Sequence, residues 1–129
     1  MALIKEITEV YSARVKAKAE NLGIKNAYRP LLTALAIKDG DTQLSLVGRT
    51  GLKAPTVSII LRKMEREGLV NRQTDENDLR KTHVFLTEKG KEANGMLLAG
   101  IDEAEHEMFA ALSDEEYAAF FEMLKRIKG

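Results

Sequence analysis

Residues 53–66 combine an apolar stripe with a polar face that could contact a polyanion. Val57, Ile60, Leu61 and Met64 recur at helical spacing, which predicts a helix that buries this side. Hydroxyl and guanidinium groups on the other side can hydrogen-bond to phosphates and to the edges of base pairs. The helix N-terminus, with its unpaired amides, also favours phosphate. The residues expected on this outer surface are Lys53, Pro55, Thr56, Ser58, Ile59, Arg62 and Lys63.

A second cationic group lies in the polar stretch that follows. The planar guanidinium of Arg80 could enter a narrow minor groove, where the negative potential of DNA is strongest. Asp78, two residues earlier and expected on the same side of an extended strand, could hold Arg80 in position. Arg72 and Lys81 add positive charge nearby. Each of these residues, taken alone, is most simply a solvated surface charge.

Other chemistry has less support. Glu103, His106 and Glu107 share one expected helical face, but a second histidine at the spacing of a helical zinc motif is missing, so a solvated acidic face is the favoured interpretation. The chain has two histidines and no cysteine, and it lacks a glycine-rich phosphate loop. We therefore predict no catalysis, no cofactor and no bound metal.

A small-molecule pocket is a further candidate. Tyr11, Tyr28 and Arg29 could line such a pocket between the first and second helices. Packing in the core with exposed polar tips explains the same residues more simply, and it is the favoured interpretation.

Periodicity and capping residues predict the elements that would position these groups. Thr42, Thr87 and Ser113 are expected helix N-caps, and Ser113 forms a capping box with Glu116. Gly51 and Gly68 are expected to end helices. The predicted helices begin near residues 3, 31, 42, 54, 88 and 114, and two strands cover 69–72 and 82–86 around a polar tip at 73–81. The fold class is therefore mainly α with a small β-hairpin wing.

Charge and composition bound the function. The 129-residue chain has a net charge of zero, but residues 42–83 hold eight basic and five acidic side chains, whereas 87–129 hold five basic and ten acidic ones. This asymmetry is typical of a molecule with one phosphate-facing surface. The absence of cysteine excludes disulfides, thiolate zinc sites and thiol redox sensing. No apolar run is long enough to span a bilayer and no signal peptide is evident, so we expect a cytoplasmic protein with no membrane partner.

Helix, turn, helix and hairpin, in that order, form a winged helix-turn-helix, and specific runs strengthen this interpretation. They are Thr-Gln-Leu-Ser-Leu at 42–46, Leu-Lys-Ala-Pro-Thr-Val-Ser at 52–58, the run from Leu61 to Arg72, Asp78-Leu79-Arg80, and Leu-Thr-Glu-Lys-Gly at 86–90. With these runs, the stretch from Tyr28 to Lys91 resembles the multiple-antibiotic-resistance regulator (MarR) family.

The resemblance implies one protomer over residues 1–129, with a winged helix-turn-helix core at 28–91 flanked by dimerisation helices at 1–23 and 92–129. It implies a homodimer on a pseudo-palindromic double-stranded DNA operator, acting as a transcriptional repressor that a small-molecule effector releases. Asp78 and Arg80 match the family's wing motif, and the lack of cysteine excludes its peroxide-sensing branch. The alternative is a winged-helix protein-interaction module that does not bind DNA, which the retained Arg62, Arg72, Arg80 and Lys81 disfavour.

Overall fold

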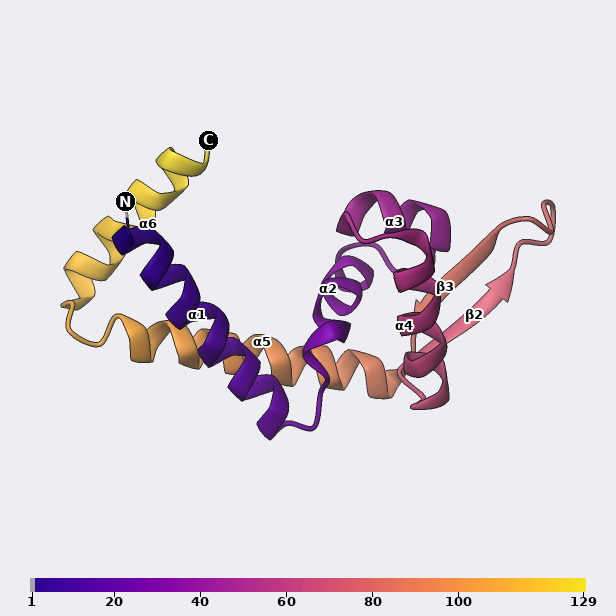
Figure 1. Ribbon diagram of the computed structural model, residues 1–129, viewed down its shortest axis with the longest axis horizontal. Helices are drawn as coiled ribbons and strands as arrows, with labels where there is room; N and C mark the ends of the chain where they lie inside the picture. The colour runs from indigo at the N-terminus through magenta and orange to yellow at the C-terminus, as the bar shows by residue number, and fades with distance from the viewer. Residues whose placement is uncertain (1) are drawn as a thin grey trace.

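The computed structural model describes residues 2–129. Figure 1 shows a helical arm built from α1, α5 and α6, and a separate lobe in which α2, α3 and α4 lie beside a projecting hairpin. Both chain ends lie on the arm, at the far end of the molecule from the hairpin (Figure 1). In chain order the elements are α1 (Ala2–Asn21), the 3-10 turn η1 (Asn26–Tyr28), α2 (Arg29–Ile37), β1 (Asp41–Thr42), α3 (Gln43–Thr50), α4 (Ala54–Arg66), β2 (Val70–Thr74), β3 (Thr82–Leu86), α5 (Glu88–Met108) and α6 (Asp114–Lys128).

The predicted caps and stops are present. The Thr42 hydroxyl accepts a hydrogen bond from the Ser45 amide at 3.1 Å, and Ser113 and Glu116 form the reciprocal capping box at the start of α6. Gly51 ends α3 with a φ of +72°, in the left-handed region that glycine tolerates best. The elements therefore begin and end close to where local sequence chemistry places them.

The core of the lobe is formed by the apolar stripes of its helices. Val57, Leu61 and Met64 of α4 are fully buried, and Ile60 is 8% exposed. They pack in one cluster with Leu31, Leu32 and Leu35 of α2, Leu46 of α3, and Val70 and Val84 of the hairpin. Burial of one face of α4 leaves its opposite face turned outward, as the periodicity predicted.

The sheet has one strand more than the sequence indicated. β1 pairs with β3, Asp41 opposite Val84 and Thr42 opposite His83, so the antiparallel order is β1-β3-β2. Two residues are too few for an alternating pattern, and this strand exists through its long-range pairing. β2 also continues to Thr74, whereas the prediction ended it at Arg72, because Gln73 and Thr74 pair with His83 and Thr82.

The arm buries fewer of its side chains than the lobe does. Val15 and Ala19 of α1 are buried against α5, but none of the residues of α6, all of which lie in the described range, is buried. Large apolar side chains on the arm stay exposed: Leu3, Ile4, Ile7, Val10, Leu98, Met123, Leu124 and Ile127. Among residues 2–129, no helix is both long and apolar enough to cross a membrane.

Candidate nucleic-acid interface

The outward face of α4 carries the side chains that the sequence placed there. Thr56 is exposed, Ile59 is 52% exposed and Arg62 lies at the surface, 3.5 Å from the Ser58 hydroxyl. Lys53 occupies the N-cap position and makes no capping hydrogen bond through its side chain, and Pro55 lies in the first turn. The exposed N-terminus of α4 therefore combines a lysine with backbone amides that can bind an anion.

Arg80 lies at the tip of the hairpin and is held by Asp78. The Arg80 guanidinium donates to the two carboxylate oxygens of Asp78 at 3.0 and 3.3 Å, yet the Arg80 side chain is 91% exposed. These hydrogen bonds hold the pKa of Asp78 below its ordinary value. The predicted pairing is confirmed, but its geometry differs. The two residues lie in a turn rather than on an extended strand, and the Arg80 amide also donates to Asp78 at 3.1 Å.

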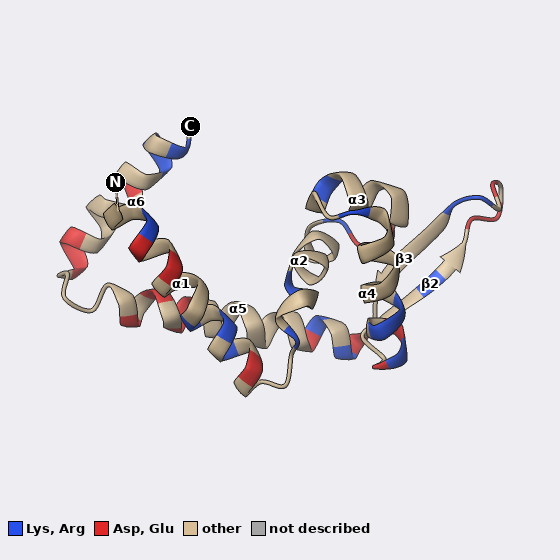
Figure 2. Ribbon diagram, in the orientation of Figure 1, with Lys and Arg blue, Asp and Glu red and all other residues tan. Residues whose placement is uncertain are grey.

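One groove joins the hairpin to the helices of the lobe. This groove has a volume of about 340 Å³ and is lined by residues of α3, the start of α4, and the hairpin just before β3. Figure 2 shows Lys and Arg on the segment that leads from the hairpin tip into β3. The cationic end of the hairpin and the N-termini of the helices therefore share one surface. The lining residues are Thr42, Gln43, Leu44, Val47, Ala54, Arg80, Lys81 and Thr82.

The other predicted cations differ in how they are engaged. Arg72 donates from Nε and Nη2 to one carboxylate oxygen of Glu65, at 3.3 and 3.0 Å, and so fastens β2 to α4. The same contact lowers the pKa of Glu65. Lys53 and Lys81 are exposed and make no ion pair within residues 2–129. Arg72 and Arg80 are thus the members of the predicted set that form ion pairs within the protein, and of the two only Arg80 keeps a largely exposed side chain.

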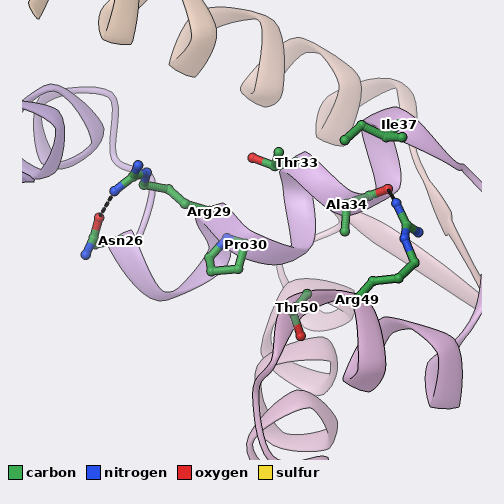
Figure 3. Close-up of a pocket in the computed structure, with 8 residues that line it drawn as sticks. All are labelled: Asn26, Arg29, Pro30, Thr33, Ala34, Ile37, Arg49 and Thr50. Atoms are coloured by element: carbon green, nitrogen blue, oxygen red, sulfur yellow. Dashed lines mark hydrogen bonds between the residues drawn. The ribbon is translucent and has the colours of Figure 1, made fainter. Parts of the chain in front are cut away.

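Asp41 and Arg49 brace the first helix of the motif, and sequence reasoning did not identify them. The Asp41 side chain is 4% exposed and accepts from Arg49 Nη1 and from the Ser45 hydroxyl, both at 2.7 Å. Arg49 Nη2 also donates to the Ala34 carbonyl at 2.7 Å, as Figure 3 shows. Burial alone would raise the pKa of Asp41, but the hydrogen bonds from Ser45 and Arg49 outweigh it and hold the pKa below its ordinary value. The bridge fixes α3 against α2.

His83 and Asp75 are also residues that the sequence did not assign to the site. His83 Nε2 lies 2.7 Å from an Asp75 carboxylate oxygen, and Nδ1 lies 2.8 Å from the Gly40 carbonyl. The other Asp75 oxygen accepts from the amides of Asn77 and Asp78. His83 is 43 residues from Gly40 and 8 from Asp75 in the chain, and neither spacing follows a helical or strand period. Gly40 and His83 come together only because β1 pairs with β3.

Comparison with known proteins shows a similarity to one family of regulators. Residues 31–82 match the model of the MarR family. The chain is 29% identical to the transcriptional regulator HosA of Escherichia coli over 97 residues, which are 75% of this chain and 72% of HosA. The chain is thus similar to MarR-family regulators over its central segment. The matched segment begins within α2 and continues through β2 and the hairpin tip, so it contains the whole candidate interface.

Solved structures of similar proteins share the fold over nearly the whole chain. A MarR transcriptional regulator from Methanosarcina mazei Go1 superposes with a TM-score of 0.81 at 28% identity, covering 98% of this chain and 91% of that one. A variant of S. aureus MepR, in a structure bound to an oligodeoxyribonucleotide, gives 0.74 at 29% identity, covering 98% and 93%. The prediction of a winged helix-turn-helix with flanking helices is therefore confirmed as a fold.

The predicted effector residues do not converge in this protein. Tyr28 is 1% exposed, and its hydroxyl donates to Glu67 at 3.0 Å. Arg29 donates to Asn26 at 3.1 Å and lines a separate cleft of about 700 Å³ between α2 and α3 (Figure 3). Tyr11 lines neither that cleft nor the one beside Tyr28. The three residues therefore line no common pocket of the protomer, and Tyr28 packs in the core, the interpretation that the sequence favoured.

The acidic cluster with His106 is not brought together either. Glu103 and Glu107 both accept from the Lys18 ammonium of α1, at 3.1 and 2.8 Å. His106 instead stacks on Tyr117 of α6 with ring centroids 5.6 Å apart, and its Nδ1 lies 2.8 Å from the Asp102 carbonyl. The three residues lie at i, i+3 and i+4 of α5 as predicted, but their side chains do not converge, because the two glutamates contact α1 and the imidazole contacts α6. In the described part of the chain, no group of three such side chains could hold a metal ion.

Proposed function

We propose that this protein is a transcriptional regulator that binds a specific double-stranded DNA operator as a homodimer. The observation that carries the proposal is the surface on which the N-terminus of α4 and the paired Arg80 border one groove. The family supports it, since the related MepR variant was solved with an oligodeoxyribonucleotide. In this arrangement α4 would enter the major groove and Arg80 the adjacent minor groove. Lys53, Pro55, Thr56, Ser58, Ile59, Arg62 and Lys81 would supply the remaining contacts.

The arm supports the dimer. α6 buries none of its residues within the chain although Phe120, Phe121 and Ile127 give it an apolar side. An apolar groove of about 560 Å³ runs between α1, the end of α5 and α6, and includes Leu3, Ile7, Phe109 and Phe120. Exposed apolar surface of this extent usually marks an interface. We therefore assign residues 1–23 and 92–129 to dimerisation and 28–91 to DNA binding.

The cleft of Figure 3 supports regulation by a small molecule. It is bordered by the guanidinium groups of Arg29 and Arg49 and by the apolar Pro30, Ala34 and Ile37. Such a lining suits a small aromatic anion. Arg49 also braces α3, so a ligand that displaced its contact with Ala34 would shift α3 and release DNA. We infer that the protein acts as a repressor that such an effector releases.

Fluorescence anisotropy titration with duplex DNA from upstream of the protein's own gene, at two salt concentrations, tests the DNA-binding proposal. Affinity should fall steeply with salt, because phosphate contacts release counterions. Arg80→Ala should weaken binding by about 1–3 kcal/mol if the guanidinium enters the groove. The matched control is Arg126→Ala, which removes an exposed arginine from α6, at the opposite end of the molecule, and which is compared once analytical ultracentrifugation shows that it is still a dimer.

Equal affinity of the wild type and Arg80→Ala would refute the minor-groove role. Failure of a folded dimer to bind this DNA or a randomised duplex pool would instead favour the alternative, a winged-helix module that binds another protein. Because the two outcomes differ in whether the wild type binds at all, they separate the role of one residue from the function itself.

A further inference from the structure

Both ring nitrogens of His83 face groups that only accept hydrogen bonds. Nδ1 lies 2.8 Å from the carbonyl oxygen of Gly40, and Nε2 lies 2.7 Å from a carboxylate oxygen of Asp75. A neutral imidazole has one N–H donor and one acceptor, so it can satisfy only one of these partners. The imidazolium form has two donors and satisfies both. The geometry therefore matches a positively charged His83.

The contact continues from Asp75 to the arginine at the hairpin tip. The second Asp75 oxygen accepts from the amides of Asn77 and Asp78, at 2.8 and 3.0 Å. Asp78 in turn accepts from the Arg80 guanidinium and from its amide. Two backbone hydrogen bonds close the tip. The Asp75 amide donates to the Lys81 carbonyl, and the Lys81 amide donates to the Asp78 carbonyl. His83 thus links the lobe at Gly40, through Asp75, to the turn that carries Arg80.

We propose that the imidazolium form of His83 is a positioning device for Arg80, and that loss of its proton loosens the hairpin tip and weakens DNA binding. This inference rests on the proposed function. With a neutral ring, either Nε2 would turn a lone pair toward the Asp75 carboxylate, or Nδ1 would turn one toward the Gly40 carbonyl. One of the two contacts would then be repulsive. The tip would lose either the contact of His83 with Gly40, which ties it to the lobe, or the contact of His83 with Asp75, which orders the turn.

The charges around His83 favour its protonated form, so DNA binding should weaken as the pH rises. Asp75 at the tip raises the pKa of His83 through its hydrogen bond, and the Gly40 carbonyl before β1 adds to the effect, whereas Lys81 opposes it. On β1, Thr42 lies opposite His83, and the neighbouring Asp41 is already paired with Arg49 and Lys38. On β2, the residue opposite is the neutral Gln73. The pKa of His83 is raised above the ordinary 6.5, so its proton is lost only as the pH climbs past that value.

The protonation itself can be measured without DNA. An NMR titration of the two histidine rings between pH 5.5 and 8.5 should show His83 titrating above the ordinary value of about 6.5. Asp75→Asn removes the carboxylate and should lower the pKa of His83 while leaving that of His106 unchanged. A His83 that is neutral throughout, or whose titration is unaffected by Asp75→Asn, would overturn the inference.

The coupling to DNA is tested by anisotropy titration across the same pH range with four proteins. Wild-type affinity should fall about three- to tenfold from low to high pH, the size of effect that one hydrogen bond supports. His83→Gln should abolish this dependence, and His106→Gln, which removes the histidine of the arm, should retain it. Arg80→Ala should bind weakly and without the pH dependence, since the effect passes through Arg80.

The outcomes separate the two proposals. An unchanged pH dependence in His83→Gln, or in Arg80→Ala, would overturn the positioning role while the DNA-binding function stands. Absence of binding by the wild type at every pH would overturn the proposed function, and the positioning role would fall with it. A comparison of circular dichroism spectra checks that each variant is folded.

Discussion

Gly90 of α5 packs tightly against the backbone of Leu69, just before β2, and its replacement tests this packing. A Cβ added there would lie 2.1 Å from the Leu69 carbonyl oxygen and 3.2 Å from Leu86 Cδ2. The obstructing carbonyl is fixed, because it accepts the Thr87 amide at 3.0 Å. Relief requires roughly 1 Å of movement between the start of α5 and Leu69. Gly90→Ala therefore has to strain or break this hydrogen bond.

The magnitude follows from three contributions. Overpacking typically costs about 1–3 kcal/mol, and weakening the hydrogen bond at Leu69 adds about 1 kcal/mol. Alanine regains up to about 1 kcal/mol of helix propensity over glycine. We expect Gly90→Ala to lower the free energy of unfolding by about 1–3 kcal/mol. Gly95, further along α5, has nothing within 4 Å of its added Cβ, so Gly95→Ala should raise the free energy of unfolding by about 0.5–1 kcal/mol.

Urea denaturation followed by circular dichroism, at one protein concentration because dimerisation contributes to stability, measures both variants. The same substitution in the same helix should thus have opposite signs at the two positions. Wild-type stability in Gly90→Ala would refute the close approach to Leu69. An equal loss in Gly95→Ala would show that the effect comes from α5 as a whole.

Two further predictions concern the lobe and the arm. Asp41→Asn should cost about 3 kcal/mol at pH 7, because it leaves the Arg49 guanidinium without its buried counter-charge. Since the folded pKa of Asp41 is lowered, its stabilisation is present above the ordinary 3.8 and is lost as the pH falls through the folded value, so urea curves of the two proteins should converge below pH 4. On the arm, Ile127→Glu should shift the protein toward monomer in analytical ultracentrifugation, whereas Ile37→Glu, at a similarly exposed position on α2, should not. A dimer unaffected by Ile127→Glu would place the interface elsewhere.

Local chemistry explains why so much of the fold was predictable. A helix N-cap needs a side-chain oxygen three residues before an amide, and Thr42, Thr87 and Ser113 satisfy that need within their own segments. The buried face of α4 was likewise predictable, because every fourth or third residue of a helix returns to one side. Such features depend only on residues that are close together in the chain, so a single sequence is enough to predict them.

The features that sequence reasoning missed depend on distant partners. His83 and Gly40 are 43 residues apart, and Arg49 reaches the Ala34 carbonyl across 15. Nothing in the spacing of these residues distinguishes them from solvated surface groups. Their partners are backbone carbonyls, which every residue carries, so only the folded chain selects which ones are used.

For Asp78 and Arg80, the sequence predicted the correct contact from an incorrect backbone conformation. Alternation along a strand predicted their proximity, but the tip is a turn in which Asp78 accepts from the Arg80 backbone as well as from its side chain. This difference matters for the function proposed. A strand would orient Arg80 through the pairing of β2 with β3, whereas the turn depends on the carboxylate of Asp75, which accepts the Asp78 amide. The orientation of Arg80 is therefore sensitive to the charge state of the groups that hold Asp75, and His83 is the side chain that does so.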